Sequence, residues 1–205
     1  KIDKEFGLNE IKTDGIDAII AADSGMDFLY ENGVTPDIIV GDFDSTTTNA
    51  LEYFERKGQT EIRRLNPIKD DTDTEYAIRL AISEGARSIV VLGATGSRID
   101  HVLGNISLLG IGLESKTDIS IIDTNNRIRM ADKPVTIEKS AQYGRFVSLI
   151  ALTDDNEVSL KGFKYPVTDY SFDRFTSLGI SNEIVDDHAL IDIHRGKFII
   201  IESKD

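Results

Sequence analysis

The stretch DTDTEYAIRLAISEGARSIVVLGATG, residues 71–96, decides the fold class of the chain. In its first half apolar residues from Ala77 to Ile82 recur with the period of a helix, and Gly85 stands where a helix C-terminal cap belongs. The run SIVVL at 88–92 is short and continuously apolar, as buried strands of parallel sheets are. A helix that leads into such a strand indicates an α/β arrangement.

The segments on either side of this stretch alternate in the same way. Apolar runs predict strands at 17–22 and 37–40 and a weaker one at 61–65. Helical patterns lie at 24–32 and, after the glycine-rich turn, at about 100–109. We therefore expect one parallel sheet covered on both faces by helices.

The pattern changes near residue 114. Beyond it, short apolar runs alternate with turn-prone segments and no long helical stripe appears, which is typical of antiparallel β structure. The runs lie at 119–122, 135–137, 145–151, 158–160, 189–193 and 198–202. The expected fold class is thus α/β, with an N-terminal parallel-sheet α/β domain over 1–114 and an all-β, sandwich-like domain over 115–205.

Composition excludes several classes of function. The chain has 40% hydrophobic residues, enough for a packed core, and a net charge of −13, which argues against nucleic acid as a partner. It has no cysteine, so disulfides, zinc–thiolate sites and a cysteine nucleophile are ruled out. No apolar run approaches the ~20 residues that span a membrane, and residues 1–7 lack the apolar core of a signal peptide. A soluble, cytoplasmic protein without a membrane partner is expected.

Three acidic clusters stand where the expected strands end or the long helix begins. Asp23 follows the first strand, Asp42 and Asp44 follow the second, and Asp71 and Asp73 precede the helix. Ligands of open parallel sheets bind outside the carboxyl ends of the strands. Carboxylates held close together repel one another unless a cation intervenes, and Mg²⁺ takes one or two carboxylates together with phosphate oxygens. The three clusters together predict a metal–phosphate site.

Each cluster also has a structural alternative. Thr72 and Glu75 have capping-box spacing, so Asp71 and Asp73 would favour a helix N-terminus without binding a metal. Asp23 would serve as a helix cap, and the second cluster would form a turn. Convergence of all three clusters favours the metal site.

The glycine-rich turn GATGSRIDH, residues 93–101, lies between a strand and a helix. Such a turn offers backbone N–H groups to an anion, and Arg98 adds a planar guanidinium that suits phosphate. The turn is neither a Walker motif nor the dinucleotide fingerprint. A purely structural turn, and a structural role for His101, are the alternatives.

These motifs carry a family resemblance. The runs DSG at 23–25, VGDFDS at 40–45, DDTD at 70–73 and GATGSRIDH at 93–101 follow the order found in thiamin diphosphokinases. The run SLGISNE at 177–183 resembles the Ser-Asn segment near the thiamin site of that family. The resemblance covers most of the chain, densely from 23 to 105.

The resemblance implies an ATP- and magnesium-binding catalytic domain, a thiamin-binding β-sandwich and a homodimer with its thiamin pockets between subunits. It implies Mg²⁺ ligands at Asp42, Asp44 and Asp73, with Asp71, Arg98 and Asp100 as further catalytic residues. The implied ATP contacts are Asp23, Ser24, Gly93, Thr95, Gly96, Ser97, Arg98 and His101. The implied thiamin contacts are Ser181, Asn182 and Phe175.

The chain departs from the family pattern at two places. Residues 1–13 are polar and lack the opening strand and Gly-Gly turn that family members often have. The chain also has no tryptophan, which some members place against the thiamin pyrimidine. Phe172, Phe175 or Tyr170 would have to supply that aromatic face.

The implied reaction is in-line attack of the thiamin hydroxyl on the β-phosphorus of ATP with release of AMP. Asp71 or Asp100 would accept the hydroxyl proton, and the sequence does not choose between them. Two rivals stay open: a diphosphokinase of the same fold acting on a pterin alcohol, and a non-catalytic nucleotide or thiamin sensor. Ser181 and Asn182 favour thiamin, with an ordinary turn between strands as their structural alternative.

Overall fold

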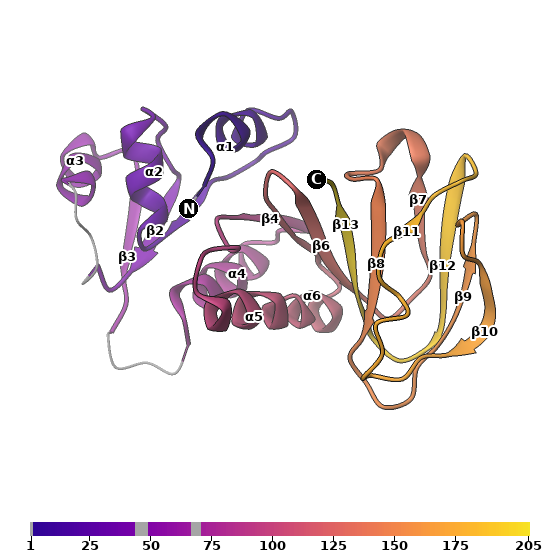
Figure 1. Ribbon diagram of the computed structural model, residues 1–205. Helices are drawn as coiled ribbons and strands as arrows, with labels where there is room; N and C mark the ends of the chain where they lie inside the picture. The colour runs from indigo at the N-terminus through magenta and orange to yellow at the C-terminus, as the bar shows by residue number, and fades with distance from the viewer. Residues whose placement is uncertain (1, 44–48, 67–70) are drawn as a thin grey trace. The chain divides into compact units, whose positions relative to one another are not determined.

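The computed structural model describes residues 2–43, 49–66 and 71–205 (Figure 1). The chain forms two compact units, Lys1–Ile89 and Val90–Asp205, and the division falls within strand β4 (Ser88–Leu92). The first unit holds a parallel sheet with helices and the second holds two larger sheets. The expected fold class is confirmed, whereas the expected functional boundary at residue 114 stays a prediction.

The sheet of the first unit has the strand order β1-β2-β3 and is parallel throughout. Its strands are β1 (Ile20–Ala22), β2 (Ile38–Gly41) and β3 (Glu61–Arg64). Each lies within or across a segment whose apolar run predicted a strand. The register pairs Ala22 with Val40, so the carboxyl ends of β1 and β2 lie side by side.

Helices cover both faces of this sheet. The first unit contains α1 (Lys4–Ile11), α2 (Gly25–Glu31), α3 (Ala50–Lys57) and α4 (Asp73–Ser83). Ile39 packs in one apolar cluster with Met26 of α2 and Phe54 of α3, and all three are fully buried. Val40 points to the opposite face because side chains alternate along a strand, and it too is fully buried. Helix α4 packs against β1 and β2, as its apolar stripe predicted.

Two of these helices were not predicted from the sequence. Helix α1 forms in the polar opening segment, where the side chain of Asp3 accepts a capping hydrogen bond from the N–H of Phe6 at 3.0 Å. Gly7 lets this helix pack closely, because a Cβ there would lie 2.5 Å from Ile2 and 2.8 Å from Phe28. Helix α3 ends at Gly58, whose φ of 64° is left-handed, as helix C-terminal caps often are.

The second unit is a β-sandwich with a helical segment. Its sheets have the orders β10-β9-β12-β7 and β11-β8-β13-β6-β5-β4. The strands are β5 (Asp118–Ile122), β6 (Asn126–Ala131), β7 (Val135–Glu138), β8 (Phe146–Ala151), β9 (Glu157–Lys161), β10 (Val167–Ser171), β11 (Asn182–Glu183), β12 (His188–Arg195) and β13 (Phe198–Ser203). In the six-stranded sheet the neighbouring strands β11, β8, β13, β6 and β5 pair antiparallel. All pairs of the four-stranded sheet are antiparallel as well. Strands β6, β10 and β11 were not predicted.

The sandwich core lies between the two sheets. Ile191 of the four-stranded sheet and Val147 and Phe198 of the six-stranded sheet are fully buried in one cluster. Phe172 belongs to this core, at 3% exposure, with its ring edge-on to Phe198 at a centroid distance of 5.8 Å. Phe172 is therefore a core residue and does not supply the aromatic face that the sequence left open.

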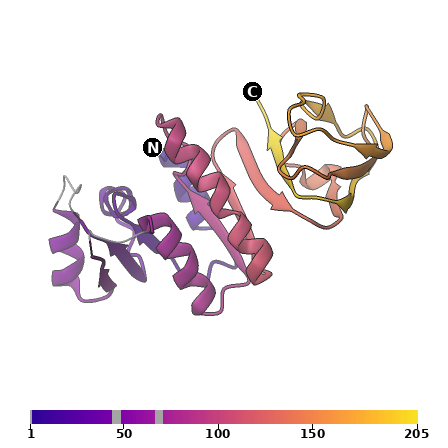
Figure 2. The same ribbon diagram turned by 90° about the horizontal axis from the view of Figure 1, so that it is seen from below.

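The placement of β4 corrects one expectation. The sequence predicted that β4 would extend the parallel sheet of the first unit, but β4 is the edge strand of the six-stranded sheet, next to β5. A continuous apolar run fits either sheet, and backbone pairing with β5 decides between them. After β4 the chain forms helices α5 (Ile99–Leu108) and α6 (Gly110–Ser115). The two helices lie almost in line with each other (Figure 2), because the linking residue Leu109 is itself helical.

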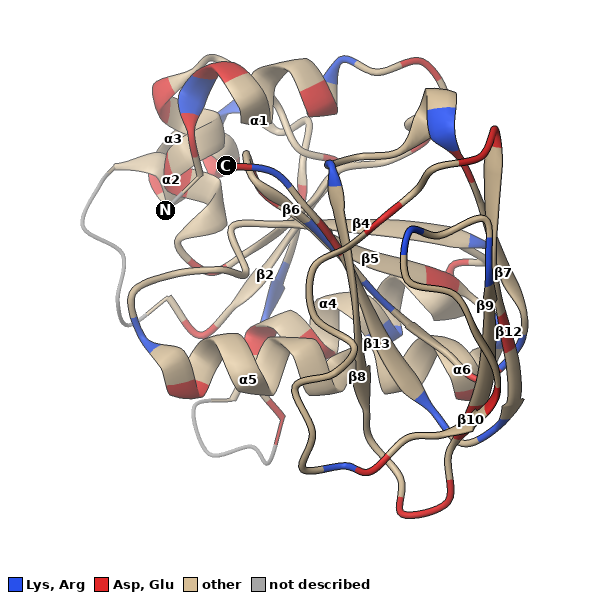
Figure 3. Ribbon diagram, turned by 45° about the vertical axis from the view of Figure 1, so that its right-hand side comes forward, with Lys and Arg blue, Asp and Glu red and all other residues tan. Residues whose placement is uncertain are grey.

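The acidic residues that give the chain its negative charge are spread over the structure. Acidic residues lie on the helices and loops of both units (Figure 3), as the net charge of −13 requires. Among the described residues, no helix is long and apolar enough to cross a membrane.

Candidate functional site

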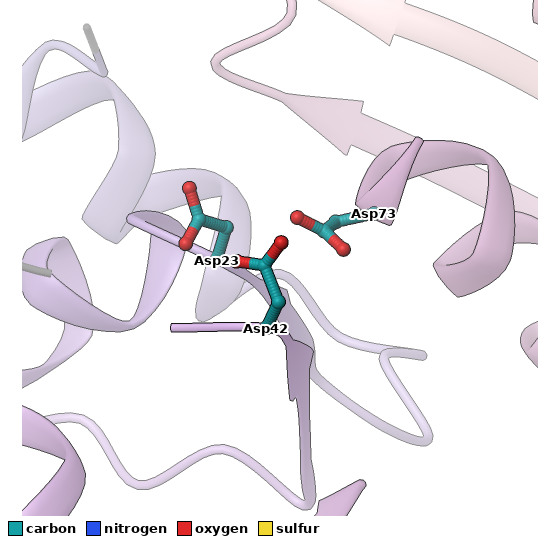
Figure 4. Close-up of side chains that lie close together, drawn as sticks. All are labelled: Asp23, Asp42 and Asp73. Carbon is teal, nitrogen blue, oxygen red and sulfur yellow. The ribbon is translucent and has the colours of Figure 1, made fainter. Parts of the chain in front are cut away.

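Three carboxylates converge at the carboxyl edge of the parallel sheet (Figure 4). Asp23 follows β1, Asp42 follows β2 and Asp73 opens α4. One oxygen of each lies within 4.8 Å of the others, and all three side chains are half-buried. We call Asp23, Asp42 and Asp73 the acid cluster.

The strand register explains why Asp23 and Asp42 meet. Ala22 pairs with Val40, and the N–H of Asp23 donates to the carbonyl of Val40 at 2.9 Å. A Cβ at Gly41 would lie 3.1 Å from the ring of Phe43, which would have to shift slightly, and at an ordinary contact distance of 3.4 Å from the Cα of Asp23. Asp23 has a φ of 44°, a left-handed value uncommon outside glycine. Backbone strain of this kind is concentrated at functional sites.

The capping interpretation of the third acidic segment is also correct. Thr72 is the N-cap of α4, and its hydroxyl accepts from the N–H of Glu75 at 3.2 Å. The Glu75 carboxylate binds Arg79 at 2.7 Å. Capping therefore uses Thr72 and leaves Asp73, in the first turn, as a member of the acid cluster, so both predicted roles coexist in this segment.

The acid cluster fits a hard divalent cation. Its donors are carboxylate oxygens, which Mg²⁺ prefers, and they come from three separate elements of one compact unit. Asp42 and Asp73 match the predicted metal ligands, whereas Asp23 had been assigned to the nucleotide. The predicted ligand Asp44 lies outside the described residues. Asp71 is exposed, two residues before Asp73.

The glycine-rich turn is fixed at two consecutive residues. The carbonyl of Ala94 accepts from Nδ2 of Asn105 on α5 at 2.9 Å. The hydroxyl of Thr95 donates to Oδ2 of Asp123, directly after β5, at 2.6 Å. Gly93 has a φ of 77°, which favours glycine where the chain leaves β4. Gly96 and Ser97 are exposed on the same turn.

Arg98 and Asp100 form an exposed ion pair at the start of α5. The Nη2 atom of Arg98 lies 2.5 Å from Oδ2 of Asp100. The hydrogen bond from Arg98 is the main reason that the pKa of Asp100 falls to about 2. His101 is exposed in the first turn of the same helix. Ser24, predicted to bind the nucleotide, is the N-cap of α2 and makes no side-chain capping bond.

The predicted thiamin residues occupy different environments. Asn182 is 6% exposed; its Oδ1 accepts from the N–H of Tyr165 at 3.0 Å and its Nδ2 donates to the carbonyl of Tyr165 at 2.9 Å. Ser181 is exposed, has a φ of 60° and donates its N–H to the hydroxyl of Ser148 at 3.0 Å. Phe175 is 91% exposed. The geometry gives Asn182 a structural role, and its contact with thiamin stays a prediction.

Sequence reasoning overlooked Asp123 and Asn105, which hold the glycine-rich turn. Neither belongs to a recognisable motif. The available signal for Asp123 was its position immediately after an apolar run, the feature that had singled out Asp23 and Asp42.

Comparison with known proteins identifies two family matches that cover most of the chain. Residues 12–122 match the family model described as "Thiamin pyrophosphokinase, catalytic domain". Residues 134–198 match the one described as "Thiamin pyrophosphokinase, vitamin B1 binding domain". The first match ends with β5 and the second begins just before β7, so they divide the chain beyond the boundary between the compact units.

Similar individual proteins agree with these matches. The chain is 34% identical to the thiamine pyrophosphokinase of Bacillus subtilis (strain 168), over 91% of this chain and 87% of that protein. The crystal structure of thiamine pyrophosphokinase from Bacillus subtilis superimposes with a TM-score of 0.88 at 32% identity, covering 100% of this chain and 94% of the other. That of thiamin pyrophosphokinase from Geobacillus thermodenitrificans gives 0.85 at 28% identity, covering 100% and 92%.

Proposed function

Because the chain belongs to the thiamin pyrophosphokinase family, we propose that it transfers the diphosphoryl group of ATP to the hydroxyl of thiamin. The products are thiamin diphosphate and AMP. The observation that carries the proposal is the acid cluster at the carboxyl edge of a parallel sheet, where such folds bind ligands. None of the matches reported above favours a pterin alcohol as the substrate.

The acid cluster would hold Mg²⁺ through Asp23, Asp42 and Asp73, with Asp44 as a further predicted ligand. When bound, the ion neutralises the charge of the phosphate oxygens. The contribution of the chain is to hold three carboxylates in place before the substrates arrive, so that little reorganisation is needed during the reaction. The strand register and the N-cap of α4 supply this positioning.

The phosphate groups of ATP would bind the glycine-rich turn and Arg98. The turn offers backbone N–H groups of Thr95, Gly96 and Ser97, and the guanidinium offers two parallel donors. Gly93 and His101 mark the ends of this segment. The family resemblance also assigns Asp23 and Ser24 to the nucleotide.

Asp71 is the better candidate for the proton acceptor. The thiamin hydroxyl oxygen forms a bond to the β-phosphorus, the bond from that phosphorus to the oxygen shared with the α-phosphate breaks, and the hydroxyl proton moves to a carboxylate. Asp100, paired with Arg98, has its pKa held at about 2 and is therefore a weak base. The ion pair with Arg98 instead gives Asp100 the role of orienting the guanidinium.

Thiamin would bind the second unit near Ser181 and Phe175, in a homodimer. Phe175 is 91% exposed and Leu178 is 58% exposed, so this segment presents apolar surface that a partner subunit and an aromatic ligand would cover. Tyr170, at 39% exposure, is a second aromatic candidate. A cytoplasmic location stays a prediction.

Product analysis with purified protein tests the proposed function. With ATP, Mg²⁺ and thiamin, we expect AMP and thiamin diphosphate in equal amounts, and neither product after chelation of the metal. ADP with thiamin monophosphate would contradict diphosphoryl transfer. Binding of both ligands without any product would identify a sensor. Replacement of thiamin by a hydroxymethyl pterin should give no AMP.

A further inference from the structure

Both carboxylate oxygens of Asp123 are hydrogen-bonded. Oδ1 accepts from the backbone N–H groups of Asn125 and Asn126, each at 2.8 Å. Oδ2 accepts from the hydroxyl of Thr95 at 2.6 Å. The first two bonds fix the carboxylate within the turn between β5 and β6, and the third joins that turn to the glycine-rich turn.

We propose that Asp123 is a positioning residue of the nucleotide site, which fixes Thr95 and thereby holds the glycine-rich turn ready for phosphate. Its importance for turnover rests on the proposed function. Asp123 lies one residue beyond the catalytic-domain match and in none of the motifs that identify the family.

The direction of the Thr95 hydrogen bond determines what the turn can offer to an anion. A hydroxyl has one proton, and an ionised carboxylate accepts but cannot donate. Burial raises the pKa of Asp123, but the hydrogen bonds from Thr95, Asn125 and Asn126 outweigh it and keep the pKa below its ordinary value of 3.8. Asp123 is thus ionised at neutral pH and takes the Thr95 proton. The phosphate must therefore bind backbone N–H groups rather than the Thr95 hydroxyl proton.

Other contacts make this arrangement a rigid support. Asn105 holds the carbonyl of Ala94, the residue before Thr95, and Ala94 is 5% exposed. The Tyr143 hydroxyl donates to the backbone carbonyl of Asp123. Two consecutive residues of the turn are thus held by two separate elements, α5 and the end of β5. Such preorganisation lowers the ordering cost of binding a ligand.

Steady-state kinetics of matched variants tests the proposal. Thr95→Val removes the hydrogen bond and Asp123→Asn replaces its anionic acceptor with a neutral amide, so each should raise the KM for ATP about tenfold, equivalent to loss of one modest interaction. The KM for thiamin should stay within about twofold. The double variant should be no worse than either single variant, because the bond can be lost only once. Asp118→Asn, at an exposed position on β5, is the control and should match the wild type.

Suppose the KM for ATP of the double variant rises by the product of the two single increases. Asp123 and Thr95 would then act independently, and the proposal would be overturned. An unchanged KM for ATP in both single variants would overturn it as well. If Asp123→Asn fails to fold, Thr95→Val decides, because it leaves the hydrogen bonds from Asn125 and Asn126 intact.

Hydrogen exchange gives a readout that does not depend on activity. Without nucleotide, peptides covering residues 93–98 should exchange faster in Asp123→Asn and Thr95→Val than in the wild type or Asp118→Asn. If that result appears in a protein that forms no AMP, the positioning role stands and the proposed function falls. If AMP forms but exchange and KM are unchanged, the positioning role is overturned.

Discussion

Arg98 and Asp100 face each other through two hydrogen bonds, with Nε 3.2 Å from Oδ1 and Nη2 2.5 Å from Oδ2. Both side chains are mostly exposed, at 68% and 65%. The guanidinium edge formed by Nε and Nη2, which binds Asp100, is the edge that would donate two hydrogen bonds to a phosphate. A bound nucleotide would therefore replace Asp100 or share the guanidinium with it, and either outcome requires the planar fork of arginine.

Arg98→Lys should lower kcat/KM by about 100-fold, because lysine cannot supply two parallel donors to a phosphate in the transition state. Initial rates at varied ATP measure the effect. Arg87→Lys, at an exposed position before β4, is the matched control and should match the wild type. A nearly unchanged Arg98→Lys enzyme would make Arg98 a surface charge and the glycine-rich turn merely structural.

The same ion pair makes a prediction about pH. The pKa of Asp100 is about 2, below its ordinary value of 3.8, so the pair is complete above about pH 4 and is lost as pH falls through 2. In Arg98→Met the main cause of the shift is absent. The pKa of the Asp100 carboxyl should then rise toward its ordinary value of 3.8, as carboxyl NMR shifts would report. A midpoint that stays near 2 in the variant would show that another group lowers the pKa.

Asp42→Asn should abolish turnover and leave the fold intact. The change removes one anionic ligand and also one partner in the repulsion within the acid cluster, so the metal-free protein should unfold at an equal or slightly higher temperature. Thermal melts and AMP release measure both effects. Asp14→Asn, exposed in the same unit, is the control. Turnover within a few-fold of the wild type would remove Asp42 from the metal site, and loss of folding would favour a structural turn.

Asn182→Ala should mainly lower the stability of the fold, whereas Phe175→Ala should mainly weaken thiamin binding. Asn182→Ala removes both hydrogen bonds that the buried Asn182 side chain makes with the backbone of Tyr165, at a cost of about 1–3 kcal/mol in the free energy of unfolding. Phe175→Ala, at an exposed side chain, should leave unfolding unchanged and raise the KM for thiamin. Denaturant melts and thiamin titrations distinguish the two. A stable Asn182→Ala protein with a raised KM for thiamin would restore Asn182 as a substrate contact.

Local sequence patterns predicted those parts of the fold that depend on local interactions. The stripe from Ala77 to Ile82 predicted α4, and the apolar runs predicted β1 to β5. The partner of β4 was not predictable, because a continuous apolar run does not identify the strand that will pair with it. Helix α1 was missed because its polar sequence depends on the Asp3 cap and on close packing at Gly7, neither of which shows as periodicity.

The residues of the candidate site likewise divide into those that local sequence predicts and those that depend on contacts between distant segments. Asp42 and Asp73 stood out because they lie in dense acidic runs. Asp23 had a helix cap as its structural alternative, and its place in the acid cluster depends on the pairing of Ala22 with Val40, which only the assembled sheet reveals. Asp123 depends likewise on a contact across 28 residues of sequence.

The last prediction concerns a homodimer in which each thiamin pocket draws on both subunits. The acid cluster belongs to the first compact unit, whereas Phe175 and Ser181 lie in the second, on a segment with much exposed apolar surface. In a two-fold dimer the same patch occurs on both subunits, so two equivalent pockets are expected. A pocket that combines Asp42 of one chain with Phe175 of the other can be rebuilt from two defective chains.

Equal amounts of Asp42→Asn and Phe175→Ala chains should therefore complement each other when mixed and allowed to exchange, with thiamin kept below the raised KM of the second variant. Half of the dimers are then mixed, and each has one pocket without either substitution, so about a quarter of wild-type activity should return. The control places both substitutions in one chain and mixes it with wild type. In its mixed dimers each of the two pockets carries one of the substitutions, so these dimers should add no activity. Sedimentation confirms the dimer, and differently tagged chains confirm exchange. A fully active monomer, or verified exchange without recovered activity, would show that each pocket is built within a single chain.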